Sequence, residues 1–366
     1  MRDLTQGSPA KQILFFTIPL VVGNLFQQLY NFSDTVIVGQ TLGVKSLAAV
    51  GATGSIMFLI LGFVQGFTAG LSIITAQRYG ARDIAGVRKS MASTLIVSTL
   101  TTIVVTILSL LAVYPLLKIM QTPAEIFDQA FIFIAIILAG LFATMGYNVT
   151  ANSLRAIGDS RSPLVYLIVG MIVNIILELW FIIGLNYGVA GAAIATVIAQ
   201  LVSSILSFWH IYRFSPLLQV NRSDLKWDAA DIRIHLRAGL PMGFQSSIIA
   251  IGALVLQGAL NTLGTDAVAA TTAAQRIDQV ATLPLMSFGI TMATFAAQNY
   301  GAQQYERILV GVKQALIMSM GFGLFMGILE IAFGDFAVML FVGSDQHRVL
   351  LSLIHISEPT RPEPIS

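Results

Sequence analysis

Gln77–Ala81 read QRYGA, and Gln298–Ala302 read QNYGA, 221 residues further along the chain. Three further features recur in the same order at nearly the same offset: TLG at 41–43 and 262–264, paired alanines at 48–49 and 269–270, and prolines at 19 and 241. Several features that keep one order and one spacing indicate an internal duplication. Both copies lie in strongly apolar surroundings, so the sequence predicts a membrane protein built from two repeats.

The composition supports a membrane protein. The chain is 56% hydrophobic and 10% charged, with a mean hydropathy of +0.81, whereas roughly 25% of an average soluble domain is charged. A net charge of +2 gives no reason to expect nucleic acid as a partner. The absence of cysteine excludes disulfides, thiolate metal sites and cysteine nucleophiles. The first apolar stretch carries Asp34 and is longer than the roughly 15 apolar residues of a signal peptide, so it reads as a retained spanning helix.

The apolar segments predict an all-α polytopic protein, because about 20 residues cross the hydrocarbon core. The nine expected spans are 13–38, 47–75, 90–114, 126–147, 163–185, 189–212, 234–260, 267–296 and 311–334. Alternate loops differ sharply in charge, since one set holds fifteen Lys and Arg residues and the other only Lys45 and Lys118. The positive-inside rule therefore predicts a cytoplasmic N-terminus.

The long polar connection at 213–237 divides the chain into two parts. We expect an N-terminal six-helix lobe at 1–213, a cytoplasmic linker at 214–233 and a partial C-terminal lobe of three helices at 234–345. An even number of helices in each repeat makes the repeats parallel, as in many transporters.

The repeat offset bears on the C-terminal end of the chain. By that offset a complete second repeat would end about 70 residues beyond this chain. We therefore expect the C-terminal lobe to be truncated here and the chain to be unable to transport as written. The residues 351–366, LSLIHISEPTRPEPIS, change abruptly in composition and are expected to be disordered or non-native.

Four polar residues of the first span share one helical face. Asn24, Gln27, Asn31 and Asp34 are spaced by three, four and three residues, which makes them neighbours on an α-helix. A polar stripe facing lipid is costly, so this face should line a protein interior or a water-filled cavity. Tyr30, in the same segment, is a further cavity-lining candidate.

Two later spans carry polar residues at a matching depth. Asn174 and Glu178 lie four residues apart on the fifth span, and Thr196 lies on the sixth. Together with Asp34 they should sit roughly 7–11 Å below the outer surface, where two carboxyls, an amide oxygen and a hydroxyl would coordinate a small hard cation or share a proton. The alternative is that the amide and hydroxyl only join helices and that Glu178 reaches water at the interface.

The second half offers different polar groups. Gln257, Arg276 and Asp278 are cavity-lining candidates there. Arg276 lies about 14 Å into its helix by residue count, so it should face the cavity or an acidic partner, unless it forms a structural ion pair or snorkels to the interface. Asp278 cannot share that face, because it is only two residues away.

The sequence lacks the motifs of several other classes of protein. The chain has no GKS or GKT phosphate loop, so no built-in ATPase is expected. It has no GxSxG motif, and its four histidines fall at helix ends or in loops. We therefore expect neither an enzyme nor a cofactor. A carrier fits the duplicated halves and the single acidic cluster better than a channel does.

These features together resemble the multidrug and toxic compound extrusion (MATE) transporters. The resemblance rests on IP at 18–19, LP at 240–241 and the pair QRYGA and QNYGA, and it extends over about residues 8–345. It implies two six-helix lobes around a central cavity and export coupled to H⁺ or Na⁺. The cation site of the family's amino-terminal lobe matches these residues of this chain: Asp34, Asn174, Glu178 and Thr196, with Asn148 as a further candidate.

The chain departs from the family pattern at one ligand. Glu178 stands where Asp is commoner, and its extra methylene would weaken a tight Na⁺ cage without harming proton carriage. The seventh span lacks the acid of the branch with a carboxy-terminal site, so the chain looks closer to the branch named for DNA-damage-inducible protein F. The resemblance implies a monomeric exporter of small organic compounds in a bacterial cytoplasmic membrane. Two alternatives remain, a lipid-precursor flippase of the same superfold and a non-transporting scaffold.

Overall fold

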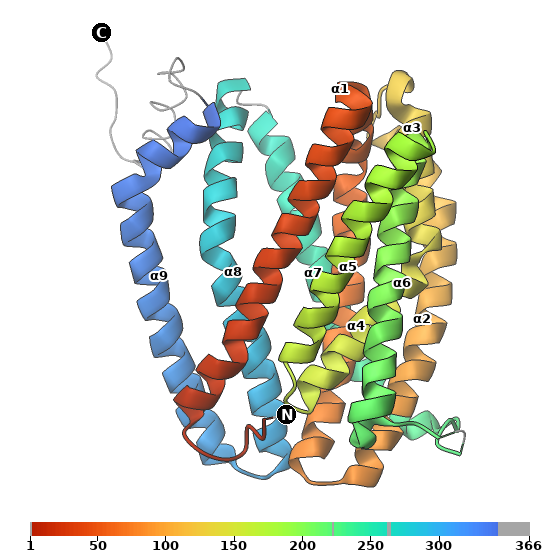
Figure 1. The fold of residues 1–366 in the computed structure, drawn as a ribbon. Coiled ribbons are helices and arrows are strands. Elements are labelled where there is room, and N and C mark those ends of the chain that lie inside the picture. The colour runs from red at the N-terminus through yellow and green to blue at the C-terminus, as the bar shows by residue number, and fades with distance from the viewer. Residues whose placement is uncertain (1, 222, 262–264, 343–366) are drawn as a thin grey trace.

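The computed structural model describes residues 2–221, 223–261 and 265–342, apart from the side chains of 250, 253–255, 257–261, 265–281 and 330–342. The described residues form helices joined by short connections, and none of them lies in a strand. Figure 1 shows these helices arranged side by side in a tall bundle. The predicted all-α class is confirmed.

The first helix is folded back on itself at a glycine. Helix α1 (Pro9–Gly80) has 72 residues, which would span about 108 Å if straight. It breaks at Gly43, where φ is +81° and ψ is −178°, a conformation that glycine adopts far more readily than other residues. In Figure 1 the first half of α1 rises to the top of the view and the second half returns behind it. These halves are the predicted spans 13–38 and 47–75.

The next helices complete the first part of the bundle. They are α2 (Ile84–Ile119), α3 (Ala124–Ala139), α4 (Leu141–Ala156), α5 (Arg161–Leu179), the π-helical turn η1 (Trp180–Gly184) and α6 (Gly188–Phe214). Helices α3 and α4 form one span bent by 46° at Gly140, where a β-carbon would lie 2.3 Å from Val197 on α6. The predicted span 126–147 therefore ended too early. Asn152 continues the helix as a buried residue, because its amide donates to the Thr68 hydroxyl at 3.0 Å.

The remaining helices pack lengthwise on α1. After the short turn η2 (Pro216–Leu218) come α7 (Ala229–Asn261), α8 (Thr265–Gly301) and α9 (Tyr305–Val342). With α1 counted as two spans and α3–α4 as one, the described helices give the nine predicted spans. Five of these helices are long and apolar enough to cross a membrane, and the bent pair makes a sixth. The protein is therefore a multi-pass membrane protein.

One end of the bundle collects the segments that are rich in Lys and Arg. The N-terminal segment, the α1–α2 turn, the 215–228 connection and the α8–α9 turn all lie at the lower end in Figure 1. We call this the basic end. The opposite end holds Lys45, which pairs with Glu125 at 3.0 Å on the exposed surface. This arrangement brings the sequence-distant repeats QRYGA and QNYGA to the same end.

Candidate functional site

Two acidic side chains from different helices meet inside the bundle, away from the basic end. Asp34 comes from the first half of α1 and Glu178 from the last turn of α5, and their carboxyl groups interact directly. Glu178 is 0% exposed. Both of its carboxyl oxygens, and Oδ1 of Asp34, are buried without a hydrogen-bond donor among the described residues. Buried carboxyl oxygens ordinarily have partners, so this pair is incomplete without a proton or a cation.

The neighbouring polar groups present further oxygens to the acid pair. Asn174 lies one turn before Glu178 and is also 0% exposed. Its Nδ2 donates to the Thr196 hydroxyl at 3.3 Å, and that hydroxyl donates to the carbonyl of Ala192 at 3.1 Å. These bonds leave Oδ1 of Asn174 buried and without a donor. The Tyr30 hydroxyl lies beside Thr196 and is likewise buried and unpartnered.

The ligand types point to a small hard cation or a proton. Two carboxyls, an amide oxygen and hydroxyls are hard oxygen donors, and two adjacent carboxyls resist simultaneous ionisation unless a proton or cation lies between them. No group of three or more His, Cys, Asp or Glu suited to a metal occurs among the described residues. With only two acids, the cluster suits a monovalent ion.

The structure does not join Asn148 to this cluster. Its Nδ2 donates to the carbonyl of Thr144 on its own helix at 2.9 Å, and no hydrogen bond among the described residues connects it to either acid. The polar residues of the predicted stripe on α1 do not share one environment. Asn24 donates to the Ser287 hydroxyl of α8 at 2.9 Å, whereas Asn31 is exposed. Gln27, between them, is half-buried.

The candidates of the second half have described backbones only. Gln257 lies on α7, and Arg276 and Asp278 lie on α8. Their side chains are outside the described part of the structure. Their predicted position in a cavity wall remains an expectation.

Sequence reasoning missed a buried polar network at the basic end. His235 is one of the four histidines expected at helix ends or in loops, yet its side chain is 0% exposed. It bonds to Ser90 of α2 at 2.8 Å, next to an ion pair between Arg78 and Asp231. The sequence feature that points to this network is Arg78, a charged residue inside the repeated QRYGA motif.

A multi-pass helical bundle with an acid pair in its interior has the features of a membrane transporter, because ionisable groups inside spanning helices are rare and usually functional. The family model described as MatE matches residues 19–180 and 241–357, which is more than half of the chain. The chain therefore belongs to the MATE family, as the resemblance implied. Members of this family are transporters rather than enzymes and need no cofactor.

Individual relatives agree with this membership. The probable multidrug resistance protein YpnP of Bacillus subtilis is 28% identical over 307 residues, covering 84% of this chain and 68% of YpnP. The DNA damage-inducible protein F of Escherichia coli is 26% identical over 309 residues, covering 82% of this chain and 66% of that protein.

Solved structures share the fold. An outward-facing multidrug resistance MATE transporter of the MOP superfamily superposes with a TM-score of 0.87 at 27% identity, covering 96% of this chain and 78% of that one. A MOP superfamily transporter from Pyrococcus furiosus gives a TM-score of 0.88 at 28% identity, with the same two coverages of 96% and 78%.

Proposed function

We propose that this protein is a multidrug exporter that exchanges H⁺ or Na⁺ for small organic compounds, with Asp34 and Glu178 as the coupling site. The observation that carries the proposal is the pair of interacting carboxyls, of which both Glu178 oxygens and Oδ1 of Asp34 are buried without a hydrogen-bond donor. A site of this kind binds a cation strongly only when its charges are not already satisfied by the protein. Asp34 and Glu178 meet that condition.

The site lies where an external cation would reach it. Asp34 is nine residues before the break at Gly43, so it sits about 14 Å along the helix from that turn. The turn is at the end of the bundle opposite the basic end (Figure 1). We place the basic end in the cytoplasm, with the N-terminus inside, on the fifteen-to-two distribution of Lys and Arg. We also propose that the protein acts as a monomer in the cytoplasmic membrane of a bacterium, a location that its similarity to proteins of Bacillus subtilis and Escherichia coli supports.

The coupling follows from differential binding. A cation that neutralises the acid pair stabilises the conformation to which it binds more tightly. A ligand shifts a conformational equilibrium only by the difference between its affinities for the two conformations. An organic cation competes for the same negative charge. Release of the drug outside and entry of the coupling ion would then alternate at one site. The relatives named for multidrug resistance support drugs as the exported compounds.

Efflux from intact cells tests this proposal. Cells that express the intact protein should extrude ethidium when a H⁺ or Na⁺ gradient is imposed, and separate gradients distinguish the two ions. Asp34→Asn should abolish this efflux at unchanged expression, because it removes one acid of the pair. The matched control is Asp224→Asn, a change of the same chemistry in the connection between α6 and α7, far along the chain from the acid pair. Full efflux by Asp34→Asn would remove the proposed site.

A further inference from the structure

The two copies of the repeated motif touch each other at the basic end. A β-carbon on Gly80 would lie 1.8 Å from the carbonyl oxygen of Gln298, and one on Gly301 would lie 1.8 Å from that of Gln77. Gly80 and Gly301 are equivalent at the 221-residue offset, and so are the two glutamines. The contact is therefore reciprocal, and each repeat places its glycine on the backbone of the other. Only glycine allows so close an approach.

The same close approach continues along the second half of α1. A β-carbon on Gly70 would lie 2.5 Å from the carbonyl oxygen of Ala238, and one on Gly66 would lie 2.3 Å from that of Met242. Helix α7 therefore lies directly on α1 from the motif toward the middle of the bundle. The first half of α1 meets α8 through a side-chain hydrogen bond instead, in which Thr17 donates to the Thr291 hydroxyl at 2.8 Å.

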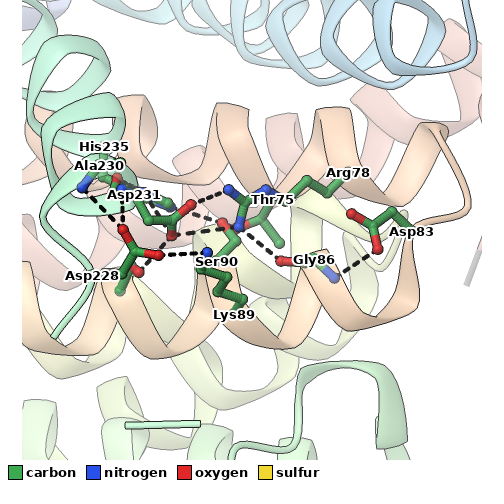
Figure 2. A network of polar contacts seen from close by, with 11 residues as sticks. Thr75, Arg78, Asp83, Gly86, Lys89, Ser90, Asp228, Ala230, Asp231 and His235 are labelled. Atoms are coloured by element: carbon green, nitrogen blue, oxygen red, sulfur yellow. Dashed lines mark hydrogen bonds and ion pairs between the residues drawn. The ribbon is translucent and has the colours of Figure 1, made fainter. Parts of the chain in front are cut away.

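A buried ion pair fastens the first motif to the start of α7. Arg78 bonds to both oxygens of Asp231, and its Nη1 also donates to the carbonyl of Gly86 at 2.9 Å (Figure 2). Ser93 donates to Oδ2 of Asp231 at 2.6 Å. Burial alone would raise the pKa of Asp231, but the bonds from Arg78 and Ser93 hold this pKa below its usual value. Asp231 is therefore charged at neutral pH.

A chain of hydrogen bonds runs beside the ion pair through three helices. Thr75 of α1 bonds to Ser90 of α2 at 2.9 Å, and Ser90 bonds to Nε2 of His235 on α7 at 2.8 Å. Nδ1 of His235 lies 2.8 Å from the carbonyl oxygen of Asp231. Figure 2 shows these side chains converging between α1, α2 and α7.

The second motif holds the segment that precedes α1 in an equivalent manner. Asn299 and Arg307 both donate to the carbonyl of Leu4, at 3.2 and 3.1 Å. Gln298 accepts from the amide of Leu4 at 3.1 Å and donates to the carbonyl of Ala156 at 2.7 Å. Each motif therefore fastens the chain just before, or at the start of, the first helix of the other repeat.

The seam between the motifs is weakly apolar. The hydrophobic cluster there consists of Ala76, Ala156 and Ala297, with Ile73 at its edge. Little apolar area is lost when such small side chains separate, and hydrophobic stabilisation scales with that area. A buried ion pair adds little stability relative to an apolar pair, because desolvation offsets its attraction, but loss of one partner is costly because it leaves the other charge buried and unpaired. The seam itself is thus specific in its geometry, and the apolar packing between the repeats lies beside it, in the clusters around Leu71 and Phe16.

We infer that the two QxYGA segments form a single gate at the basic end, in which Gly80 and Gly301 permit closure and the Arg78–Asp231 pair is the latch. The inference rests on the proposed exporter function, because alternating access needs an end that seals and reopens. In the closed state the motifs cross, and the latch holds α7 against α1 and α2. In the open state the glycine contacts separate together, because they are one reciprocal contact.

The absence of cysteine allows a clean test by cross-linking. Thr17→Cys with Thr291→Cys reports the contact between the two repeats beside the seam, where α1 meets α8, since their hydroxyls lie 2.8 Å apart. Thr75→Cys with Ser90→Cys, 2.9 Å apart on α1 and α2, reports folding within the first repeat. The full chain in membranes is oxidised with copper phenanthroline, and remaining thiols are counted with a maleimide mass tag. Both pairs should cross-link in the otherwise unchanged chain.

Substituting a gate glycine should separate the two reporters. Gly80→Val should lower the Thr17–Thr291 cross-linking rate at least several-fold and leave the Thr75–Ser90 rate unchanged. Gly54→Val is the matched control, because a β-carbon on Gly54 of the same helix meets no atom within 4 Å, and both rates should stay unchanged. An unchanged Thr17–Thr291 rate in Gly80→Val would overturn the gate.

A second variant decides the result if Gly80→Val fails to fold and loses both cross-links. Asp231→Asn keeps the shape of the latch and removes its charge, so it should lower the Thr17–Thr291 rate and retain the Thr75–Ser90 rate. No change in either rate would overturn the latch. The cross-linking readout involves no transport, so the gate and the coupling site can fail separately. If the cross-links behave as expected but the Asp34→Asn variant still transports, the coupling site is wrong and the gate is retained.

Discussion

Replacing Glu178 by methionine should stabilise the cation-free protein. Glu178 is 0% exposed, and both of its carboxyl oxygens lack donors. A buried polar atom without a partner costs about 1–3 kcal/mol, and a methionine side chain places no such polar atom at this position. Methionine matches glutamate in length and adapts to its surroundings. We expect the free energy of unfolding to rise by about 2 kcal/mol.

Tryptophan fluorescence during denaturation in detergent measures this change, and Trp180 lies two residues beyond the substitution. The control is Glu125→Met, since the Glu125 side chain is 75% exposed and pairs with Lys45 at the surface. Surface pairs contribute about 0–1 kcal/mol, so this variant should differ little from the parent protein.

The gain from Glu178→Met should shrink when a cation occupies the site. A ligand at 100 times its Kd stabilises the folded parent protein by about 2.7 kcal/mol, and Glu178→Met cannot bind it. Saturating Na⁺, or acidification if H⁺ is the coupling ion, should therefore cancel or reverse the difference. A Glu178→Met variant that is less stable than the parent in the absence of cation would refute the view that these oxygens are unsatisfied.

Three further predictions follow from topology, coupling and helix packing. Ser223→Cys should react with an impermeant maleimide only after cells are permeabilised, and Lys45→Cys should react in intact cells; the reverse pattern would refute the orientation. In the efflux assay Glu178→Gln should impair transport while Glu178→Asp is tolerated, because aspartate keeps the carboxyl, and equal activity of the two would argue against a role for this acid. Gly66→Val should lower the free energy of unfolding by about 1–3 kcal/mol, because its side chain would overlap the carbonyl of Met242, and unchanged stability in chemical denaturation would contradict the packing.

Local sequence pattern was enough to predict most of the fold. Apolar length identified the spans, and the repeated QxYGA motif identified the duplication. The helical spacing of Asn174 and Glu178 placed them on one face, and the structure buries both. The apolar pattern did not predict the full length of α4, because Asn152 and Arg155 lower the hydropathy of its second half. Those residues remain helical because they bond inside the bundle, with Arg155 donating to Asn152 at 3.0 Å.

Contacts between distant segments lay beyond sequence reasoning. The spacing of Asn24 and Asp34 predicted a shared face, but it contained no information about which helix would cover each residue. The structure pairs Asn24 with Ser287 of α8 and Asp34 with Glu178 of α5. The same limit applies to His235, whose burial depends on α1 and α2 lying beside the start of α7. Position along one helix does not determine such neighbours.

Infrared difference spectroscopy of the acid pair tests the coupling site most directly. The carbonyl stretch of a protonated carboxyl reports whether Asp34 and Glu178 hold a proton, without any need for transport. We expect acidification of the parent protein to produce such a band. The band should shift in Asp34→Asn and in Glu178→Gln, because each variant keeps one of the two carboxyls, and it should disappear when both substitutions are combined. If Na⁺ is the coupling ion, its addition should remove the band in the parent. A band that persists unchanged in both variants would contradict a cation site built on these two acids.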